Sequence, residues 1–117
     1  MTANAEASFT QTLYEAAVVV EAHGSLNVVG VPGFRAALQR AVETDKALVV
    51  IDLADVSFLD SAGLAVVFRA QRLLPVSQKM VLVNVPDRMR RVLRLAGVNA
   101  VVDVQEPGDP QPWLEQV

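Results

Sequence analysis

The sequence predicts a small α/β domain, a mostly parallel sheet of four to five strands with helices packed against it. Short β-branched runs alternate with amphipathic segments at helical spacing. Hydrophobic residues make up 52% of the chain and aromatic residues only 5%, so Val, Leu, Ala and Ile must build the core. The length of 117 residues suits one domain. We expect its core over about residues 8–106 and a tail or short helix over 107–117.

The N-terminal part of the chain predicts two strands and a helix. Residues up to about Ala7 suggest a frayed end, residues 9–14 an edge strand, and residues 17–22 a buried strand closed by a turn at His23-Gly24. The pattern of residues 27–31 does not decide their secondary structure. A helix then opens at Pro32-Gly33 and fades over residues 43–45. Its apolar stripe is expected to comprise Phe34, Ala37, Leu38, Ala41 and Val42.

The central part of the chain predicts the clearest strand and a second helix. Residues 47–53 are apolar on both faces, the pattern of a strand covered on two sides. Residues 54–63 suggest a loop anchored by Val56 and Phe58. A helix starts near Ser61 and stops at Pro75. Its buried face is expected to comprise Leu64, Val67, Phe68 and Leu74, and its solvent-exposed face Arg69 and Arg72.

The C-terminal part predicts a strand over residues 80–85, a helix from Pro86 and a last strand over residues 100–104. Gly97 suits the C-terminal end of that helix. A short helix at Trp113-Leu114 is expected to hold the indole on the core. The expected apolar stripe of the helix is Met89, Val92, Leu93 and Ala96.

Composition limits the function classes. The chain has no cysteine, which excludes disulfides, thiolate catalysis and Cys-ligated metals. Its first ten residues show no signal-peptide pattern, and no apolar run reaches the roughly 20 residues of a membrane helix. We therefore expect a cytoplasmic protein with no membrane insertion. The net charge of −3 argues against nucleic-acid binding. The basic cluster reads as a solvated helix face, or else as a patch for an acidic partner: Arg88, Arg90, Arg91 and Arg94.

The sequence contains no convincing catalytic set. His23 is the single histidine and reads as a turn residue. The glycines lack the spacing of phosphate-binding and dinucleotide motifs. Asp52, Asp55 and Asp60 surround one loop where a Mg²⁺ site is conceivable, but capping of loop and helix N–H groups is the favoured reading. We therefore predict a binding module rather than an enzyme, with no metal and no cofactor.

The segment over residues 50–64 carries a family resemblance. It reads VIDLADVSFLDSAGL, an apolar strand with Asp-Leu, then an apolar-Ser-Phe step and Asp-Ser-small-Gly-Leu. It closely resembles the signature of the STAS family, which includes bacterial anti-sigma factor antagonists. Residues 24–27 resemble the family's Gly-x-Leu-x turn, and residues 86–97 its third helix. The resemblance covers about residues 15–104 and implies the same fold.

The resemblance implies a phosphorylation switch at Ser61. In the antagonists, a partner anti-sigma factor, itself a serine kinase of the GHKL (histidine-kinase-like ATPase) type, phosphorylates the serine of the Asp-Ser-x-Gly motif. The unphosphorylated antagonist binds that kinase and frees the sigma factor, and a serine phosphatase resets the system. Ser57 ranks second as the phosphorylated serine, because its neighbours suggest packing. A homodimer is left open. The implied partner-binding residues are Asp60, Ser61, Ala62, Gly63, Leu64, Ser25 and Asn27.

The turn near this serine departs from the family pattern. Many phosphorylated members have Gly-Glu-Leu-Asp there, whereas this chain has Ser25 and Asn27 at the acidic positions. The following residues 28–34 are unusually apolar and suggest a docking surface for a partner.

Two alternatives stay open. STAS domains also serve as small subunits of lipid-transport ATP-binding cassette complexes, and Gly63-Leu64-Ala65 resembles that subgroup. A ligand-binding sensor or enzyme that uses Asp52 or Asp60 is the other.

Overall fold

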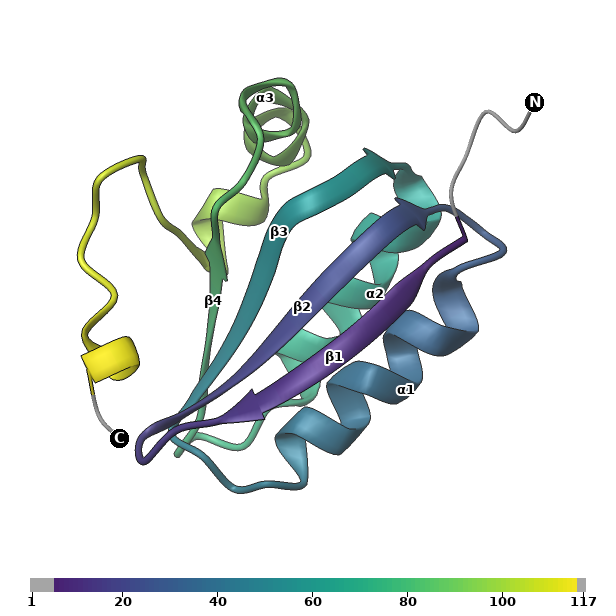
Figure 1. Ribbon diagram of the computed structural model, residues 1–117. Helices are drawn as coiled ribbons and strands as arrows, with labels where there is room; N and C mark the ends of the chain where they lie inside the picture. Colours follow the sequence, from purple (N-terminus) through teal and green to yellow (C-terminus); the bar gives the residue numbers. More distant parts are fainter. Residues whose placement is uncertain (1–5, 116–117) are drawn as a thin grey trace.

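A computed structural model describes residues 6–115 and contains a five-stranded sheet in the order β1-β2-β3-β4-β5 (Figure 1). The strands are β1 (Ser8–Leu13), β2 (Ala17–Leu26), β3 (Leu48–Leu59), β4 (Lys79–Val83) and β5 (Asp103–Val104). Only β1 pairs antiparallel, along β2, and the other neighbouring pairs are parallel. The predicted mostly parallel α/β fold is confirmed.

Helices occupy the segments between β2 and β5, and a short one follows β5. They are α1 (Val31–Val42), α2 (Ser61–Leu73), α3 (Asp87–Leu95) and the 3₁₀ helices η1 (Val98–Ala100) and η2 (Pro112–Glu115). Figure 1 shows α1 and α2 side by side on one face of the sheet, and α3 at the end where β3 and β4 finish. The element order agrees with the predicted alternation of strands and helices. No helix in the described part of the chain has the length and apolarity to cross a membrane.

Helix α1 forms as its periodicity predicts. Pro32 lies in its first turn, where the missing N–H removes no helical hydrogen bond. Four residues of the predicted stripe are buried, and Val42 is half-buried. The rings of Phe9 and Phe34 stack with centroids 5.6 Å apart, which ties β1 to this helix. Apart from this aromatic pair, the buried side chains of α1 are the aliphatic residues Ala37, Leu38 and Ala41.

Helix α2 is rotated by about one residue from the predicted face. Its buried residues are Gly63, Val66 and Val67, whereas the predicted Leu64 and Phe68 are only half-buried. Val66 was not expected in the core. The rotation follows from Gly63, which turns toward the sheet because it has no side chain to keep it away.

Strands β2 and β3 both extend further than predicted. The expected turn at His23-Gly24 is wrong: β2 continues through both residues, and Gly24 takes the left-handed φ of 85°. The expected loop after Leu53 is also wrong, because β3 continues to Leu59. Beyond Asp52, β3 pairs with β2 alone. The extension is thus a two-stranded ribbon that carries the chain to the start of α2.

Two register shifts bend this ribbon. Residue pairs shift between Glu21 and His23 and again between Gly24 and Ser25, with the extra residues on β3. The shifts break the simple alternation, so the residues that face inward are Leu53, Val56 and Leu59. The predicted anchor Val56 is confirmed. The prediction for Phe58 is wrong, since its side chain is 46% exposed.

The C-terminal elements agree with the prediction in part. Met89 and Leu93 are buried in α3, but Val92 and Ala96 are exposed because α3 contacts the rest of the molecule along a narrow stripe. Gly97 follows the helix with φ of 84°, as a helix-ending glycine does. The last strand has two residues instead of the five predicted, because a 3₁₀ turn takes up residues 98–100.

The indole of Trp113 covers the sheet face opposite to α1 and α2. It is 5% exposed and packs on Val50, Val81 and Val83. The predicted short helix at Trp113-Leu114 is confirmed as η2, in the yellow segment of Figure 1. The C-terminal segment therefore completes the second hydrophobic layer.

Candidate functional site

The candidate site lies at the N-terminus of α2, where β3 ends. Asp60 is the N-cap: its Oδ1 accepts hydrogen bonds from the N–H groups of Ala62 at 2.9 Å and Gly63 at 3.2 Å. This satisfies two of the N–H groups that a helix start leaves open. The interpretation of Asp60 as a helix cap is confirmed. Ser61 becomes the first residue of the helix.

Ser61 is the accessible hydroxyl of this helix start. Its side chain is exposed, and its hydroxyl forms no hydrogen bond with the described residues. A modifying enzyme would therefore reach this oxygen without breaking an internal contact. Ser57, the second candidate, is also exposed, but its carbonyl oxygen accepts a 3.0 Å hydrogen bond from Arg88 Nη2. The backbone at Ser57 is thus held by α3.

Gly63 seats α2 against the end of β2. A Cβ at this position would lie 2.5 Å from the carbonyl oxygen of Leu26 and 2.6 Å from Cδ1 of Leu59. The same Leu26 oxygen accepts a 3.5 Å hydrogen bond from the N–H of Asp60. Gly63 is buried, so it holds the start of α2 in position and offers no surface for a partner to contact.

The end of β2 and the turn after it lie beside this helix start, but the two predicted contact residues there differ in exposure. Ser25 is 2% exposed, and its Oγ has no hydrogen-bond partner within the described residues. Its side chain therefore cannot contact a partner protein in this conformation, which corrects the expectation for this residue. Asn27 is half-buried, and its Oδ1 accepts hydrogen bonds from Val29 N at 3.0 Å and Gly30 N at 3.2 Å. Asn27 thus shapes the turn.

The apolar segment over residues 28–34 is divided between surface and core. Val28 and Val29 are 71% and 78% exposed. Phe34 is 1% exposed and belongs to the core. The predicted docking surface is therefore reduced to the valine pair at the tip of the turn.

The three aspartates do not share one site. Asp52 Oδ1 accepts a 3.0 Å hydrogen bond from Ala54 N inside the ribbon bend, and its Oδ2 accepts one from Asn84. Asp55 Oδ2 lies 3.2 Å from Nδ1 of His23, which is half-buried in β2 and not in a turn. Within residues 6–115, no three His, Cys, Asp or Glu side chains converge as metal ligands do.

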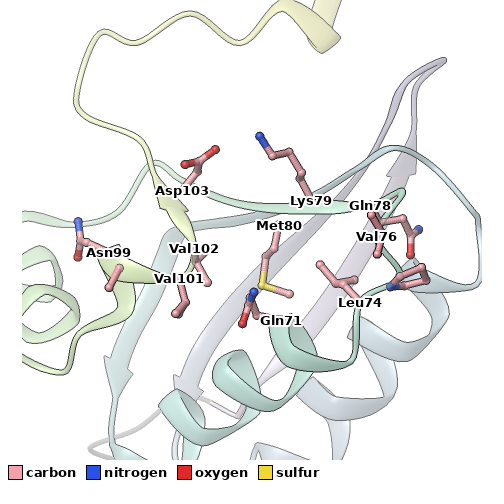
Figure 2. A pocket seen from close by; sticks show the side chains of 12 residues that line it. Gln71, Leu74, Val76, Gln78, Lys79, Met80, Asn99, Val101, Val102 and Asp103 are labelled. Atoms are coloured by element: carbon pink, nitrogen blue, oxygen red, sulfur yellow. The ribbon is translucent and has the colours of Figure 1, made fainter.

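Two cavities border helix α2. A groove of about 450 Å³ runs between α1 and α2 and starts at Ala62, next to Ser61. A second cavity of about 360 Å³ lies at the other end of the sheet, where β4 begins (Figure 2). Its lining includes Gln71 and Met80, with Lys79 and Asp103 as its charged residues. Of these two cavities, the groove is the one that adjoins Ser61, and a further cavity of about 470 Å³ is lined by Ser25 and Asn27.

A comparison with protein families agrees with this architecture. A family model described as "Mlab, STAS domain" matches residues 9–103. The chain belongs to the STAS domain family. The match covers all but the first and last residues of the sheet, together with α1, α2 and α3, so it includes both strands that lead to the site. No protein with a curated description matches the sequence.

Several solved structures share this STAS fold. An anti-sigma factor antagonist from Mycobacterium paratuberculosis is 23% identical, with 89% of each chain covered and a TM-score of 0.81. The anti-sigma factor antagonist SpoIIAA in its unphosphorylated form is 22% identical over 85% of this chain and 88% of that one, with a TM-score of 0.65. The phosphorylated form of SpoIIAA, described as a Bacillus cell fate determinant, is 23% identical over 86% of this chain and 93% of its own, with a TM-score of 0.63. At these identities the comparison establishes the fold.

Proposed function

We propose that this STAS protein is an anti-sigma factor antagonist whose binding to an anti-sigma factor serine kinase is controlled by phosphorylation of Ser61. The observation that carries the proposal is the exposed Ser61 hydroxyl at the start of α2, free of internal hydrogen bonds to the described residues. The fold is shared with solved anti-sigma factor antagonists, one of which is known in both phosphorylated and unphosphorylated forms. Both findings support the proposal.

The charge change at this helix start explains how a phosphate would act. A phosphoserine carries between one and two negative charges at neutral pH. Asp60 already occupies the N–H groups of Ala62 and Gly63, so these amides do not neutralise the phosphate in this conformation. The added charge would therefore lie beside the Asp60 carboxylate at the surface. A partner that covers Ser61 with apolar or acidic groups would lose affinity through desolvation and repulsion.

The remaining parts of the proposal follow from what the resemblance to the anti-sigma factor antagonists implies. The kinase partner is a GHKL-type ATPase, a serine phosphatase removes the phosphate, and the protein acts in the cytoplasm on transcription without catalysing a reaction itself. The contact surface comprises the exposed Ser61 and the half-buried residues around it, namely Asp60, Ala62 and Leu64, with Asn27 at its edge.

Affinity capture tests the proposal. The purified protein serves as bait in a lysate of its source organism, as wild type, Ser61→Ala and Ser61→Glu in parallel, and Ser57→Glu is the matched control. Mass spectrometry identifies the captured proteins. We expect wild type, Ser61→Ala and Ser57→Glu to capture a small histidine-kinase-like ATPase, and Ser61→Glu to lose it. Equal capture by Ser61→Glu would refute control at Ser61.

A second candidate is a small subunit of a lipid-transport ATP-binding cassette complex. The Gly63-Leu64-Ala65 step resembles that subgroup. The matching family model also takes its description from the STAS protein Mlab, not from an antagonist. Capture of a transporter ATPase by all the bait variants alike would favour this candidate.

A further inference from the structure

The groove between α1 and α2 has an apolar floor that is open to solvent. It contains about 450 Å³ and follows α2 over nearly the whole helix, from Ala62 to Leu73. At 1.5 Å per residue, this stretch is about 16 Å long, or three helical turns. Leu73 at its far end is 67% exposed. The apolar part of its lining is Leu38, Val42, Ala62, Ala65, Val66, Ala70 and Leu73.

The two helices that form this groove carry charge of one sign. Neither contains an acidic residue, although the whole chain has a net charge of −3. Their basic residues are Arg35, Arg40, Arg69 and Arg72. Arg40 and Arg72 lie in the last turns, where a cation interacts favourably with the helix dipole. Arg35 and Arg69 have no such role, and both line the groove.

The guanidinium groups of Arg35 and Arg69 have no carboxylate partner among the residues that the structure describes. The ion pairs among residues 6–115 involve His23 and Arg90 and neither groove arginine. Both groove arginines are exposed, one on each helix. Guanidinium groups bind carboxylates through paired hydrogen bonds. The rim of the groove thus offers two separate carboxylate-binding positions above an apolar floor.

We propose that this groove docks an acidic amphipathic helix of a protein partner. Its apolar residues would lie on the floor, at the spacing typical of helix-in-groove recognition, and its carboxylates would pair with Arg35 and Arg69. A single-headed anion such as a fatty acid would use one arginine and leave the other unmatched. The length of the groove and its two cationic positions therefore fit a polypeptide with several acidic residues.

Ser61 lies at one end of the groove, which connects the groove with the proposed control by phosphorylation. This step of the inference rests on the proposed function. Ala62 lines that end together with Arg35, and Ser61 precedes Ala62. A negative charge on Ser61 would lie at the entrance of the groove, where it repels an acidic helix and attracts Arg35. The acidic character of the occupant thus gives a physical reason for its release on phosphorylation.

Two synthetic peptides of about 15 residues test the groove without any cellular partner. One has leucines at i, i+3, i+4 and i+7 with glutamates between them, and its twin has lysines in place of the glutamates. Amide chemical shifts of the isotope-labelled protein locate the binding site of each peptide. Titrations of wild type, the double variant Arg35→Glu with Arg69→Glu, and the matched control Arg94→Glu give the affinities.

We expect the acidic peptide to shift amides along α1 and α2, and to bind the double variant roughly tenfold more weakly while Arg94→Glu binds as wild type does. Ser61→Glu should also weaken binding. Shifts outside the groove, equal binding of the lysine twin, no binding of the acidic peptide, or displacement of that peptide from the groove by a second copy of the chain would each overturn the proposal. These results do not depend on which protein a lysate capture identifies, so the groove and the proposed function can fail separately.

Discussion

At the scale of single residues, Asp60 and Gly63 determine where Ser61 lies. The Asp60 carboxylate closes the first turn of α2, and Gly63 lets that turn approach the carbonyl oxygen of Leu26. Ser61 lies between them and takes part in neither contact, so its hydroxyl stays at the surface. The cap requires a side chain that accepts hydrogen bonds at Asp60, whereas the close approach requires the absence of a side chain at Gly63. One substitution tests each requirement.

Gly63→Ala tests the close approach. Helix propensity alone predicts stabilisation by about 1 kcal/mol, because alanine replaces glycine inside a helix. The new Cβ would meet the Leu26 carbonyl at 2.5 Å, so we expect destabilisation of roughly 2 kcal/mol instead. Urea denaturation measures the free energy of unfolding. Ala65→Gly, on an exposed part of the same helix, gives the propensity term by itself, and a stabilised Gly63→Ala protein would contradict the packing described here.

Asp60→Ala and Asp60→Asn together separate the capping role of Asp60 from the effect of its charge. We expect Asp60→Ala to lower the free energy of unfolding by about 1 kcal/mol, because two N–H groups lose their acceptor. Asp60→Asn keeps an oxygen acceptor and should retain most of that stability. Thermal unfolding of both variants measures the difference. Equal losses in the two variants would mean that the carboxylate acts through its charge and not as a cap.

At the scale of elements, the sequence predicts the alternation of strands and helices but not the length of β2 and β3. Gly24 and the polar residues Asp55 and Ser57 have the composition of a turn and a loop, yet the structure places them in a bent two-stranded ribbon, in which Ser57 is an unpaired residue at a register shift. Pairing between strands far apart in the sequence overrides these local preferences. Phe58, expected as a buried anchor of a loop, lies instead on this bent ribbon and is 46% exposed.

The helix faces show a similar limit for the candidate site. Asp60 is predictable as a cap because cap residues have a local signature, and the structure confirms that role. The choice of Ser61 as the modified serine comes from the family resemblance and stays a prediction. The rotation of α2 was missed because a periodicity of apolar side chains does not count Gly63 as a core position. The groove was missed as well, although the four arginines and missing acids of α1 and α2 are visible in the sequence. Only the structure places these two helices side by side.

Trp113→Ala tests the contribution of η2. The indole closes the sheet face over Val50 and Val81, so its loss should lower the free energy of unfolding by about 3 kcal/mol. Leu114→Ala, at a position 48% exposed, should change it by less than about 1 kcal/mol. Urea denaturation followed by circular dichroism measures both variants. Similar small effects of the two substitutions would show that the C-terminal segment does not stabilise the fold.

At the scale of the whole molecule, charge is separated between faces. The helix layer carries the arginines of α1 and α2, whereas the opposite sheet face carries Glu21, Asp52 and Asp55. Ser61, the proposed phosphorylation site, lies where the helix layer starts. A partner with an acidic docking element would therefore approach the helix layer and avoid the open face of the sheet.

This separation predicts how partner binding depends on salt. Raising the ionic strength from about 0.05 to 0.5 M shortens the screening length several-fold, and should slow association with the captured partner. Surface plasmon resonance at several salt concentrations measures the association rate. The control is Arg35→Glu with Arg69→Glu, whose association should be slower and much less sensitive to salt. A salt-independent rate for wild type would contradict electrostatic docking.

Control of partner binding by Ser61 is the central claim, and a calorimetric titration tests it most directly. The purified partner kinase is titrated with the unmodified protein and with protein phosphorylated at Ser61. We predict binding that is tenfold or more weaker for the phosphorylated protein, roughly the effect of adding a dianion to a buried contact. Equal affinities of the two forms would contradict the account, whichever partner is captured.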